Sequence, residues 1–268
     1  MKIIFPTDLS DESLENIINV LPALVNKEKE TEVIFFHTVE QPTQGATLMM
    51  DITKILKTDA INQMEGEKKK IAEKLGITIR PEVRVGYYDV ELRDFVLETK
   101  PDLVVLISKA KHGIMRYISG QRSLKFVGEL AAPLLIIPEN LDFTQMRKFG
   151  IGVDETEDPT MESMGRIKQL SGYYETQVEM MHIYKDKIEN QEYYDRISET
   201  SDFGDVQMVT AQKVEEGIKK WCMEKEIDVL IMLTHDKNLF QRTFGGSVSR
   251  EIVKNNMLSL LIINQSFH

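Results

Sequence analysis

Cysteine is nearly absent from this sequence, since Cys222 is the single one among 268 residues. An intramolecular disulfide is therefore excluded, and the composition suits a reducing compartment. Cys222 lies beside Trp221 in a stretch with helical periodicity. We interpret it as a buried, inert thiol rather than a nucleophile.

The sequence also lacks long apolar runs and an excess of positive charge. Its longest apolar runs, such as 103–107 and 134–137, are far shorter than the ~20 residues that a membrane-spanning helix needs. The N-terminal stretch passes directly into a short strand pattern and has no signal-peptide core. The net charge is −10, which disfavours binding to nucleic acid or to anionic membranes. We therefore expect a cytoplasmic protein with no nucleic-acid or membrane partner.

What the chain does contain is an internal repeat. A short strand pattern that ends at Asp8 returns at 148–153 before Asp154, and the run that ends at His37 returns at His182. Three later matches share an offset of 126 residues: 100–106 with 226–232, Gly120 with Gly246, and 133–137 with 259–263. The matches keep their order, which predicts two copies of one folding unit. The second copy has lost about twenty residues after its second strand.

Each copy has the pattern of five short strands that alternate with four helices. The strands are continuous apolar runs, typical of strands buried on both faces of a parallel sheet. The alternation predicts two tandem, doubly wound α/β modules, each an open five-stranded parallel sheet with helices on both faces. We place the modules at residues 1–145 and 146–268, and we interpret 41–75 as a long helical segment specific to the first.

Several motifs give the chain a family resemblance over nearly its whole length. The first strand closes with Pro6-Thr7-Asp8-Leu9-Ser10, the second strands close with His37-Thr38 and His182-Ile183, and Gly86 follows the third strand. In this arrangement the chain resembles the universal stress protein family in its tandem two-domain form. The resemblance implies an adenine nucleotide alpha hydrolase-like fold for each module.

The resemblance also implies how the two modules pair. Family members associate through the last strand, so 134–137 should pack against 260–263 and form an internal pseudo-dimer of two sheets. An apolar strand at an open sheet edge needs such cover. A higher oligomer is left open.

In nucleotide-binding members of the family, the loop after the fourth strand holds the phosphates with glycine N–H groups and a helix N-terminus. The resemblance therefore implies ATP or another adenine nucleotide as a cofactor, or a different phosphate-bearing ligand. The motif and the charges around it assign these residues to binding: Asp8, Thr38, Gly86, Lys109, Lys111, Gly120, Gln121, Arg122, Ser123, Asp154, Gly246 and Ser247.

The phosphate loop departs from the family pattern in both copies. Its first glycine position holds Ile107 in the first copy and Leu233 in the second, and its next holds Ala110 and Asp236. The added bulk and the charge of Asp236 work against phosphate binding. However, residues 107–125 contain five cations and no acid, where an anion would bind. The first copy is the better candidate for a ligand site.

Some of these residues also have simpler interpretations. Asp8 and Asp154 are candidates for helix N-caps as well as for ligand contacts. His37 and His182 end equivalent strands, but they lie in different modules without a metal-binding spacing nearby, so we predict no metal site. No Gly-x-Ser-x-Gly motif presents a nucleophile, and we predict no catalytic residue.

The sequence as a whole predicts a non-enzymatic, regulatory stress-response protein that binds an adenine nucleotide or another phosphate ligand in its first module. Two alternatives stay open. One is a protein-interaction scaffold with degenerate pockets. The other is a weak nucleotide hydrolase that uses His112 or Asp8.

Overall fold

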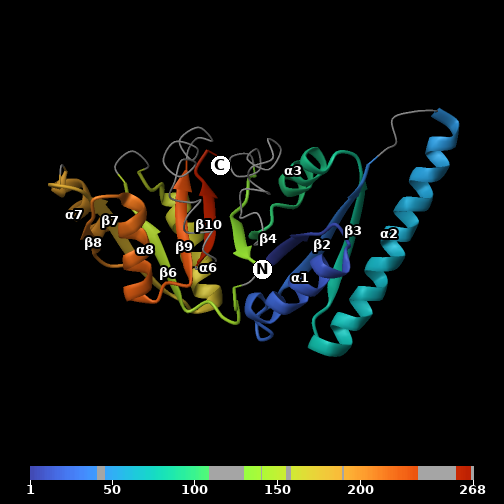
Figure 1. Ribbon diagram of the computed structural model, residues 1–268, viewed down its shortest axis with the longest axis horizontal. Coiled ribbons are helices and arrows are strands. Elements are labelled where there is room, and N and C mark those ends of the chain that lie inside the picture. The colour runs from blue at the N-terminus through green and yellow to red at the C-terminus, as the bar shows by residue number, and fades with distance from the viewer. Residues whose placement is uncertain are drawn as a thin grey trace.

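The computed structural model describes residues 1–40, 46–108, 130–139, 141–154, 158–188, 190–234 and 258–266. Strands and helices alternate along the chain (Figure 1). The first half, residues 1–138, holds β1 (Lys2–Pro6), α1 (Asp11–Leu24), β2 (Glu32–Val39), α2 (Ala46–Leu75), β3 (Ile79–Val85), α3 (Tyr88–Thr99), β4 (Leu103–Ser108) and β5 (Leu134–Pro138). The second half, residues 148–266, holds β6 (Lys148–Gly152), α6 (Met161–Tyr174), β7 (Gln177–Tyr184), α7 (Gln191–Thr200), β8 (Val206–Thr210), α8 (Val214–Lys225), β9 (Val229–Thr234) and β10 (Ser259–Asn264). The fourth helix expected in each copy falls on 109–129 and 235–257, outside the described residues.

The described strands form one ten-stranded sheet in the order β3-β2-β1-β4-β5-β10-β9-β6-β7-β8. Within each half the strands pair in parallel, which confirms the predicted doubly wound topology. β5 and β10 pair antiparallel, with Leu135 opposite Leu261. The expected strands thus meet, but they join the two expected sheets into a single continuous one. The backbone N–H and C=O groups at the edge of each strand bond to the other strand. Without this pairing they would face solvent.

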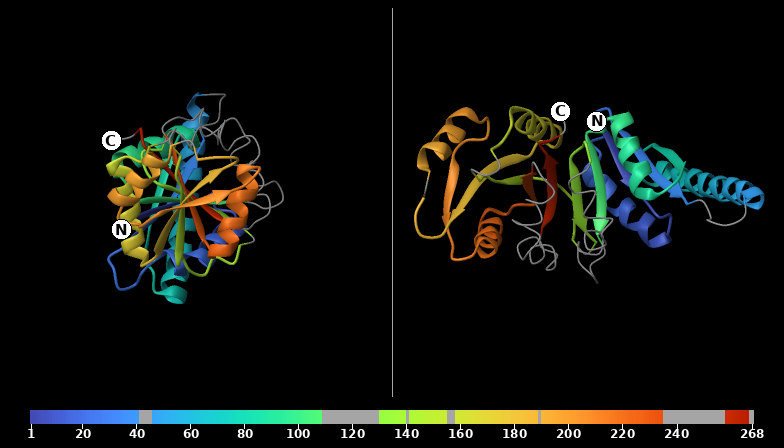
Figure 2. Two further views of the ribbon diagram at one scale, coloured as in Figure 1. Left: turned by 90° about the vertical axis from the view of Figure 1, so that its left-hand side faces the viewer. Right: turned by 90° about the horizontal axis from the view of Figure 1, so that it is seen from above.

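The sheet is buried on both faces, because each strand contributes to two core layers. Successive residues of a strand point to opposite faces, so Ile3 and Phe5 lie in one layer and Ile4 in the other. One layer contains residues of α1, α2, α6 and α7, and the other contains residues of α3 and α8. Figure 2 shows helices on both sides of the twisted sheet. This burial explains why the strand sequences are continuous apolar runs rather than alternating ones.

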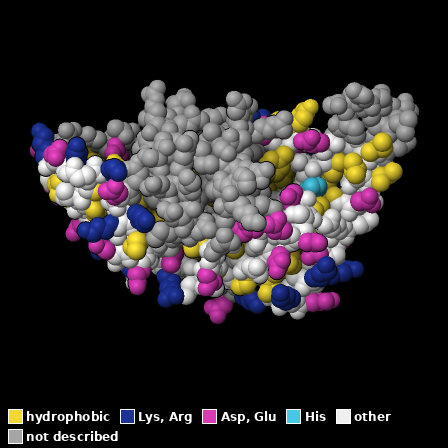
Figure 3. Space-filling model, viewed as in Figure 1, with side chains coloured by type: hydrophobic (Ala, Val, Ile, Leu, Met, Phe, Trp, Pro, Cys, Tyr) yellow, Lys and Arg dark blue, Asp and Glu magenta, His cyan; other side chains and the backbone are white. Residues whose placement is uncertain are grey.

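The clearest difference between the halves is the helix after the second strand. α2 has 30 residues and α7 has 10, so the segment missing from the second copy is helix. This confirms the predicted long helical segment of the first copy. Near its N-terminal end, α2 exposes the apolar side chains of Ile52, Ile55 and Leu56, and Figure 3 shows yellow side chains over that end of the molecule.

The lone cysteine belongs to the core layer of α3 and α8. Cys222 is buried in α8 beside Trp221, and burial raises the pKa of its thiol to about 12. Such a thiol stays protonated and unreactive at neutral pH. The prediction of a buried, inert cysteine is confirmed.

The C-terminal end of α6 docks on the turn that follows α1, and we call this contact the α1–α6 latch. The backbone N–H of Asn26 donates to the hydroxyl of Tyr173 at 3.0 Å, and the hydroxyl of Tyr174 donates to the carbonyl of Leu24 at 3.3 Å. The ammonium group of Lys29 donates to the carbonyls of Gly172 at 3.0 Å and Tyr173 at 2.8 Å. The latch adds polar contacts between the halves to the pairing of β5 with β10.

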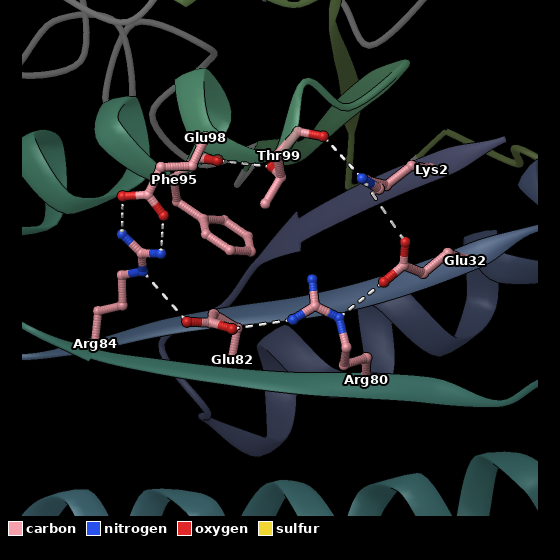
Figure 4. A network of polar contacts seen from close by, with 8 residues as sticks. All are labelled: Lys2, Glu32, Arg80, Glu82, Arg84, Phe95, Glu98 and Thr99. Carbon is pink, nitrogen blue, oxygen red and sulfur yellow. Dashed lines mark hydrogen bonds and ion pairs between the residues drawn. The ribbon is translucent and has the colours of Figure 1, made fainter.

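A network of charged side chains holds α3 against the first three strands (Figure 4). Arg84 on β3 pairs with Glu82 and with Glu98 of α3, and its guanidinium carbon lies 4.6 Å from the ring centroid of Phe95. The hydrogen bond with Glu98 raises the pKa of Arg84 and lowers the pKa of Glu98. The network continues through Arg80 and Glu32 to Lys2, which donates to the carbonyl of Thr99 at 2.8 Å. α3 is thereby fixed at its C-terminal end, while its first residue faces the site described next.

Candidate functional site

A cleft of about 360 Å³ opens at the carboxyl ends of β1, β2 and β4. β1 has β2 on one side and β4 on the other, so the order of the strands reverses here. Open α/β sheets bind their ligands at such switch points. We call this site the β1–β4 cleft, and it is lined by Pro6, Thr7, Asp8, Ser13, Asn16, Ile17, His37, Thr38, Glu40, Tyr88, Val105, Leu106 and Ile107.

A larger, open groove of about 850 Å³ lies along the α1–α6 latch, next to the first residues of β6. It is bordered by residues that hold the two halves together, among them Asn26, Tyr173 and Tyr174. The amino ends of parallel strands are not where such sheets bind ligands. We therefore assign the functional site to the smaller cleft, which also contains Asp8 and Thr38.

The turn between β1 and α1 places Asp8 at the rim of the β1–β4 cleft. The Oδ1 atom of Asp8 accepts from the backbone N–H of Ser10 at 3.0 Å and from the Ser10 hydroxyl at 2.6 Å. Ser10 in turn accepts from the N–H of Ser13 at 3.2 Å and is the N-cap of α1. The interpretation of Asp8 as the cap is therefore wrong, because the left-handed backbone at Leu9 (φ 61°) delays the helix start. The exposed Asp8 carboxylate orients the cap residue from the cleft side.

The end of β2 contributes an imidazole with a defined tautomer. The Nδ1 atom of His37 lies 2.9 Å from the carbonyl oxygen of Thr7. Because a carbonyl only accepts, Nδ1 carries the proton of the neutral ring, and Nε2 is then an acceptor. Thr38 follows on the same strand and also lines the cleft, so two of the predicted site residues, Asp8 and Thr38, come together here.

Several lining residues were not identified from the sequence, and three of them are polar residues from separate elements. Asn16 comes from α1, Glu40 follows β2, and Tyr88 begins α3. The amide nitrogen of Asn16 donates to Glu139 at 2.8 Å, which links α1 to the residue after β5. Of the three, only Glu40 carried a sequence signal, because it directly follows a predicted strand at the ligand-binding edge.

The described wall of the β1–β4 cleft is acidic rather than basic. Among its described lining residues, Asp8 and Glu40 carry charge and no lysine or arginine is present. The predicted contacts Lys109, Lys111, Gly120, Gln121, Arg122 and Ser123 lie outside the described residues. Ile107, which replaces the first loop glycine, forms part of the wall. Carboxylates, hydroxyls and an imidazole suit the hydroxyl and amino donors of a ligand rather than its phosphates.

Gly86 does not line the cleft and serves the turn between β3 and α3. Its N–H donates to the carbonyl of Val39 at 3.1 Å, and its φ of 152° is rarely adopted by other residues. A Cβ atom at this position would lie 2.4 Å from Oε1 of Glu91. The Glu91 side chain can move away, so it is the backbone conformation that favours glycine in this turn, which leads to the cleft residue Tyr88.

The corresponding place in the second half is filled by the protein's own side chains. His182 repeats the geometry of His37, with Nδ1 3.0 Å from the carbonyl oxygen of Val153. The ring of Tyr194 stacks on His182 with centroids 4.1 Å apart, and its hydroxyl lies 3.0 Å from Nε2. Tyr193 packs beside it and donates to the carbonyl of Asp154 at 3.2 Å. Burial raises the pKa of Tyr193.

The helix cap of the second half also differs from the sequence prediction. The N-cap of α6 is Thr160, so the interpretation of Asp154 as the cap is wrong. The Oε1 atom of Gln265, which follows β10, accepts from the N–H of Thr160 and from the hydroxyl of Ser163, both at 2.8 Å. Gln265 is buried, and these two hydrogen bonds fix it to the start of α6. The predicted residues Gly246 and Ser247 lie outside the described residues.

The described residues were also compared with the needs of a metal site and of a membrane span. No group of three or more His, Cys, Asp or Glu side chains in the described ranges is placed to hold a metal ion. None of the helices that the structure describes has the length and hydropathy needed to cross a membrane.

Comparison with protein families identifies the first half. The model of the Universal stress protein family matches residues 1–138, which is more than half of the chain. This chain belongs to the universal stress protein family. A universal stress protein of Methanocaldococcus jannaschii is 28% identical over 142 residues, which cover 51% of this chain and 81% of that relative.

The universal stress protein fold extends over both halves. The crystal structure of a universal stress protein from Archaeoglobus fulgidus covers 98% of this chain and 96% of its own, with a TM-score of 0.68 at 11% identity. A functionally unknown protein from Pseudomonas aeruginosa covers 99% of this chain and 92% of its own, with a TM-score of 0.55 at 11% identity. At this level of identity the two structures establish the fold of the chain.

Proposed function

We propose that this universal stress protein is a non-enzymatic regulator of the stress response that binds an adenine nucleotide, or another phosphate-bearing metabolite, in the β1–β4 cleft. The observation that carries the proposal is the cleft itself, which opens at the switch point of the first half and contains the Asp8 carboxylate. The cations of 107–125 follow β4 in the sequence and supply the charge for the phosphates.

The two ends of such a ligand have separate partners. Asp8, Glu40 and Thr38 face the cleft and offer acceptors for ribose hydroxyls and amino groups. We assign the phosphates to the residues that the motif and the charge pattern predict, Lys109, Lys111, Gly120, Gln121, Arg122 and Ser123. The ligand would therefore lie with its sugar at the end of β1 and its phosphates over the end of β4.

Calorimetric titration with ATP, ADP, AMP and cyclic dinucleotides tests the proposal. We expect binding of at least one of them, and Asp8→Asn should weaken it roughly tenfold or more, because a hydrogen bond to a charged group is lost. The asparagine keeps an acceptor for Ser10, and the equivalent change Asp154→Asn in the second half is the matched control with unchanged affinity. Absence of heat with every nucleotide would refute ligand binding.

The closed second half favours a different role for that part of the chain. Tyr194 covers His182 and Gln265 bonds the start of α6, so we assign the second half to partner recognition and to support of the first. Under this proposal the halves are two domains, residues 1–145 and 146–268, of a cytoplasmic protein. A hydrolase would require phosphate release from ATP that Asp8→Asn abolishes in the folded protein, and we expect no such turnover.

A further inference from the structure

The ten-stranded sheet has two outer strands, β3 and β8, and β3 is protected against further pairing. Its charged side chains belong to the network of Figure 4, and they are Arg80, Glu82 and Arg84. The N–H of Gly86 donates to the carbonyl of Val39 on β2. Because residues alternate along a strand, Pro81 faces outward and has a ring in place of an N–H. Charges and proline at an outer strand prevent another chain from pairing with it.

β8 lacks both of these protections. The stretch 206–212 contains neither a charged residue nor a proline. The N–H of Ala211 donates to the carbonyl of Tyr184 on β7 at 3.0 Å. Because the backbone groups of successive residues point to opposite sides of a strand, Met208 and Thr210 direct their N–H and C=O groups away from β7. The outer side of β8 therefore presents backbone donors and acceptors.

The open part of this edge begins after the first residue of β8. The N–H of Val206 donates to the hydroxyl of Ser198 on α7 at 2.9 Å, so α7 covers the start of the strand. No described residue bonds to the outward groups of Met208 and Thr210. The left view of Figure 2 faces this end of the sheet, with helices to either side of the outer strands. An uncharged strand with open backbone groups is a template for another extended strand.

The charges on either side of β8 indicate a second copy of this chain as the partner. In an antiparallel pair with two-fold symmetry, the residues before β8 in one copy lie beside the residues after β8 in the other. The register that places Met208 opposite Thr210 of the other copy pairs all four of their outward groups. The same register brings Asp205, which precedes β8, beside Lys213, which follows it. Lys213 already contacts Glu216 of its own chain and would gain a second carboxylate. Opposite charges across paired strands stabilise the pair.

We infer that two copies of this chain associate by antiparallel pairing of their β8 strands, which joins their sheets into one. The pairing repeats between chains what β5 and β10 do within one chain. The inference goes beyond the proposed function and does not depend on nucleotide binding, and it gives the second half a surface and a partner. Because the contact is short, we expect a weak dimer with a Kd on the order of 10–100 μM.

Sedimentation equilibrium of the full chain at increasing concentration tests the inference. Thr210→Pro removes the outward N–H of an exposed residue and leaves the bonds between β8 and β7 in place. It should weaken the dimer roughly tenfold or more, because two-fold symmetry removes the hydrogen bond twice. Thr210→Ala is the matched control, since it keeps the N–H, and it should dimerise like the native chain. Thermal unfolding shows whether each variant is folded.

A second pair of variants tests the partner and the orientation without any change in the backbone. Asp205→Lys and Lys213→Asp each place like charges opposite one another, and each should weaken self-association about 3- to 10-fold. An equimolar mixture of the two variants should associate like the native chain, because each supplies the charge that the other lacks.

Three results would overturn the inference. A native chain that stays monomeric at about ten times the expected Kd would show that β8 does not pair with a second copy. A dimer that folded Thr210→Pro leaves unchanged would use another surface. A mixture of the two charge variants that associates no better than either alone would exclude the antiparallel arrangement.

Discussion

The first and second halves of this protein share a framework and differ in what occupies the edge of the sheet. Both halves order their strands in the same way, and both hold a histidine by the carbonyl of the neighbouring strand's end. In the first half that histidine lines a cleft of about 360 Å³. In the second half the equivalent histidine is covered by Tyr194.

The difference shows that separate parts of the sequence determine the fold and the site. Buried strands such as β4 and β9 keep their apolar runs because the sheet is covered on both faces. The site is decided by a few side chains on the elements that follow the strands, Tyr194 on α7 and Gln265 after β10 among them. One copy can therefore close its site without any change in fold.

The largest expected effect comes from removing the ring that closes the second half. Tyr194 is 2% exposed, so Tyr194→Ala should destabilise the protein by about 3–5 kcal/mol in urea unfolding. Tyr194→Phe, which removes only the hydroxyl over His182, should cost about 1 kcal/mol. In the open half, His37→Asn should cost no more than Tyr194→Phe. A loss below about 1 kcal/mol for Tyr194→Ala would mean that this ring does not close the second half.

The residues after the last strands give the next comparison. Gln265 accepts from two groups at the start of α6, so Gln265→Ala leaves one buried and one half-buried donor without that acceptor and should cost about 2 kcal/mol. Its counterpart Glu139 accepts from the amide of Asn16 in a bond that is only partly buried, and Glu139→Ala should cost about 0.5–1 kcal/mol. If thermal unfolding showed the same loss of stability for both variants, the residue after β10 would contribute no more to its half than the residue after β5 does. That result would contradict the comparison.

At neutral pH the smallest effect is that of a change in the two equivalent core helices, and it grows only as the pH rises. Val96 of α3 and Cys222 of α8 lie in the same core layer, and burial raises the pKa of the thiol from 9.0 to about 12. The folded state therefore holds the proton more tightly, and the stabilisation is complete below pH 9 and is lost as the pH rises towards 12. Relative to Cys222→Val, the native protein should lose about 1.4 kcal/mol per pH unit in that window. Parallel stability curves for the two proteins would rule out this linkage.

The sequence was sufficient for the strands and their parallel, doubly wound arrangement, because continuous apolar runs have few other places to lie, and the family resemblance implied the pairing of the last two strands. A motif also placed Asp8 and Thr38 at the ends of strands, and both line the cleft. The sequence could not predict that Asn16 and Tyr88 line the cleft, because each lies on a separate helix and only the packing of the helices brings it there. The caps are Ser10 and Thr160, because each turn holds more than one residue type that can cap a helix and the sequence alone did not decide between them.

The central claim is that one half is open to a ligand and the other is closed by its own side chains. A calorimetric titration of the full chain with AMP measures this directly through the stoichiometry. The account predicts close to one molecule bound per chain, lost in Asp8→Asn and kept in Asp154→Asn. Two molecules per chain, or one that disappears with Asp154→Asn instead, would contradict it.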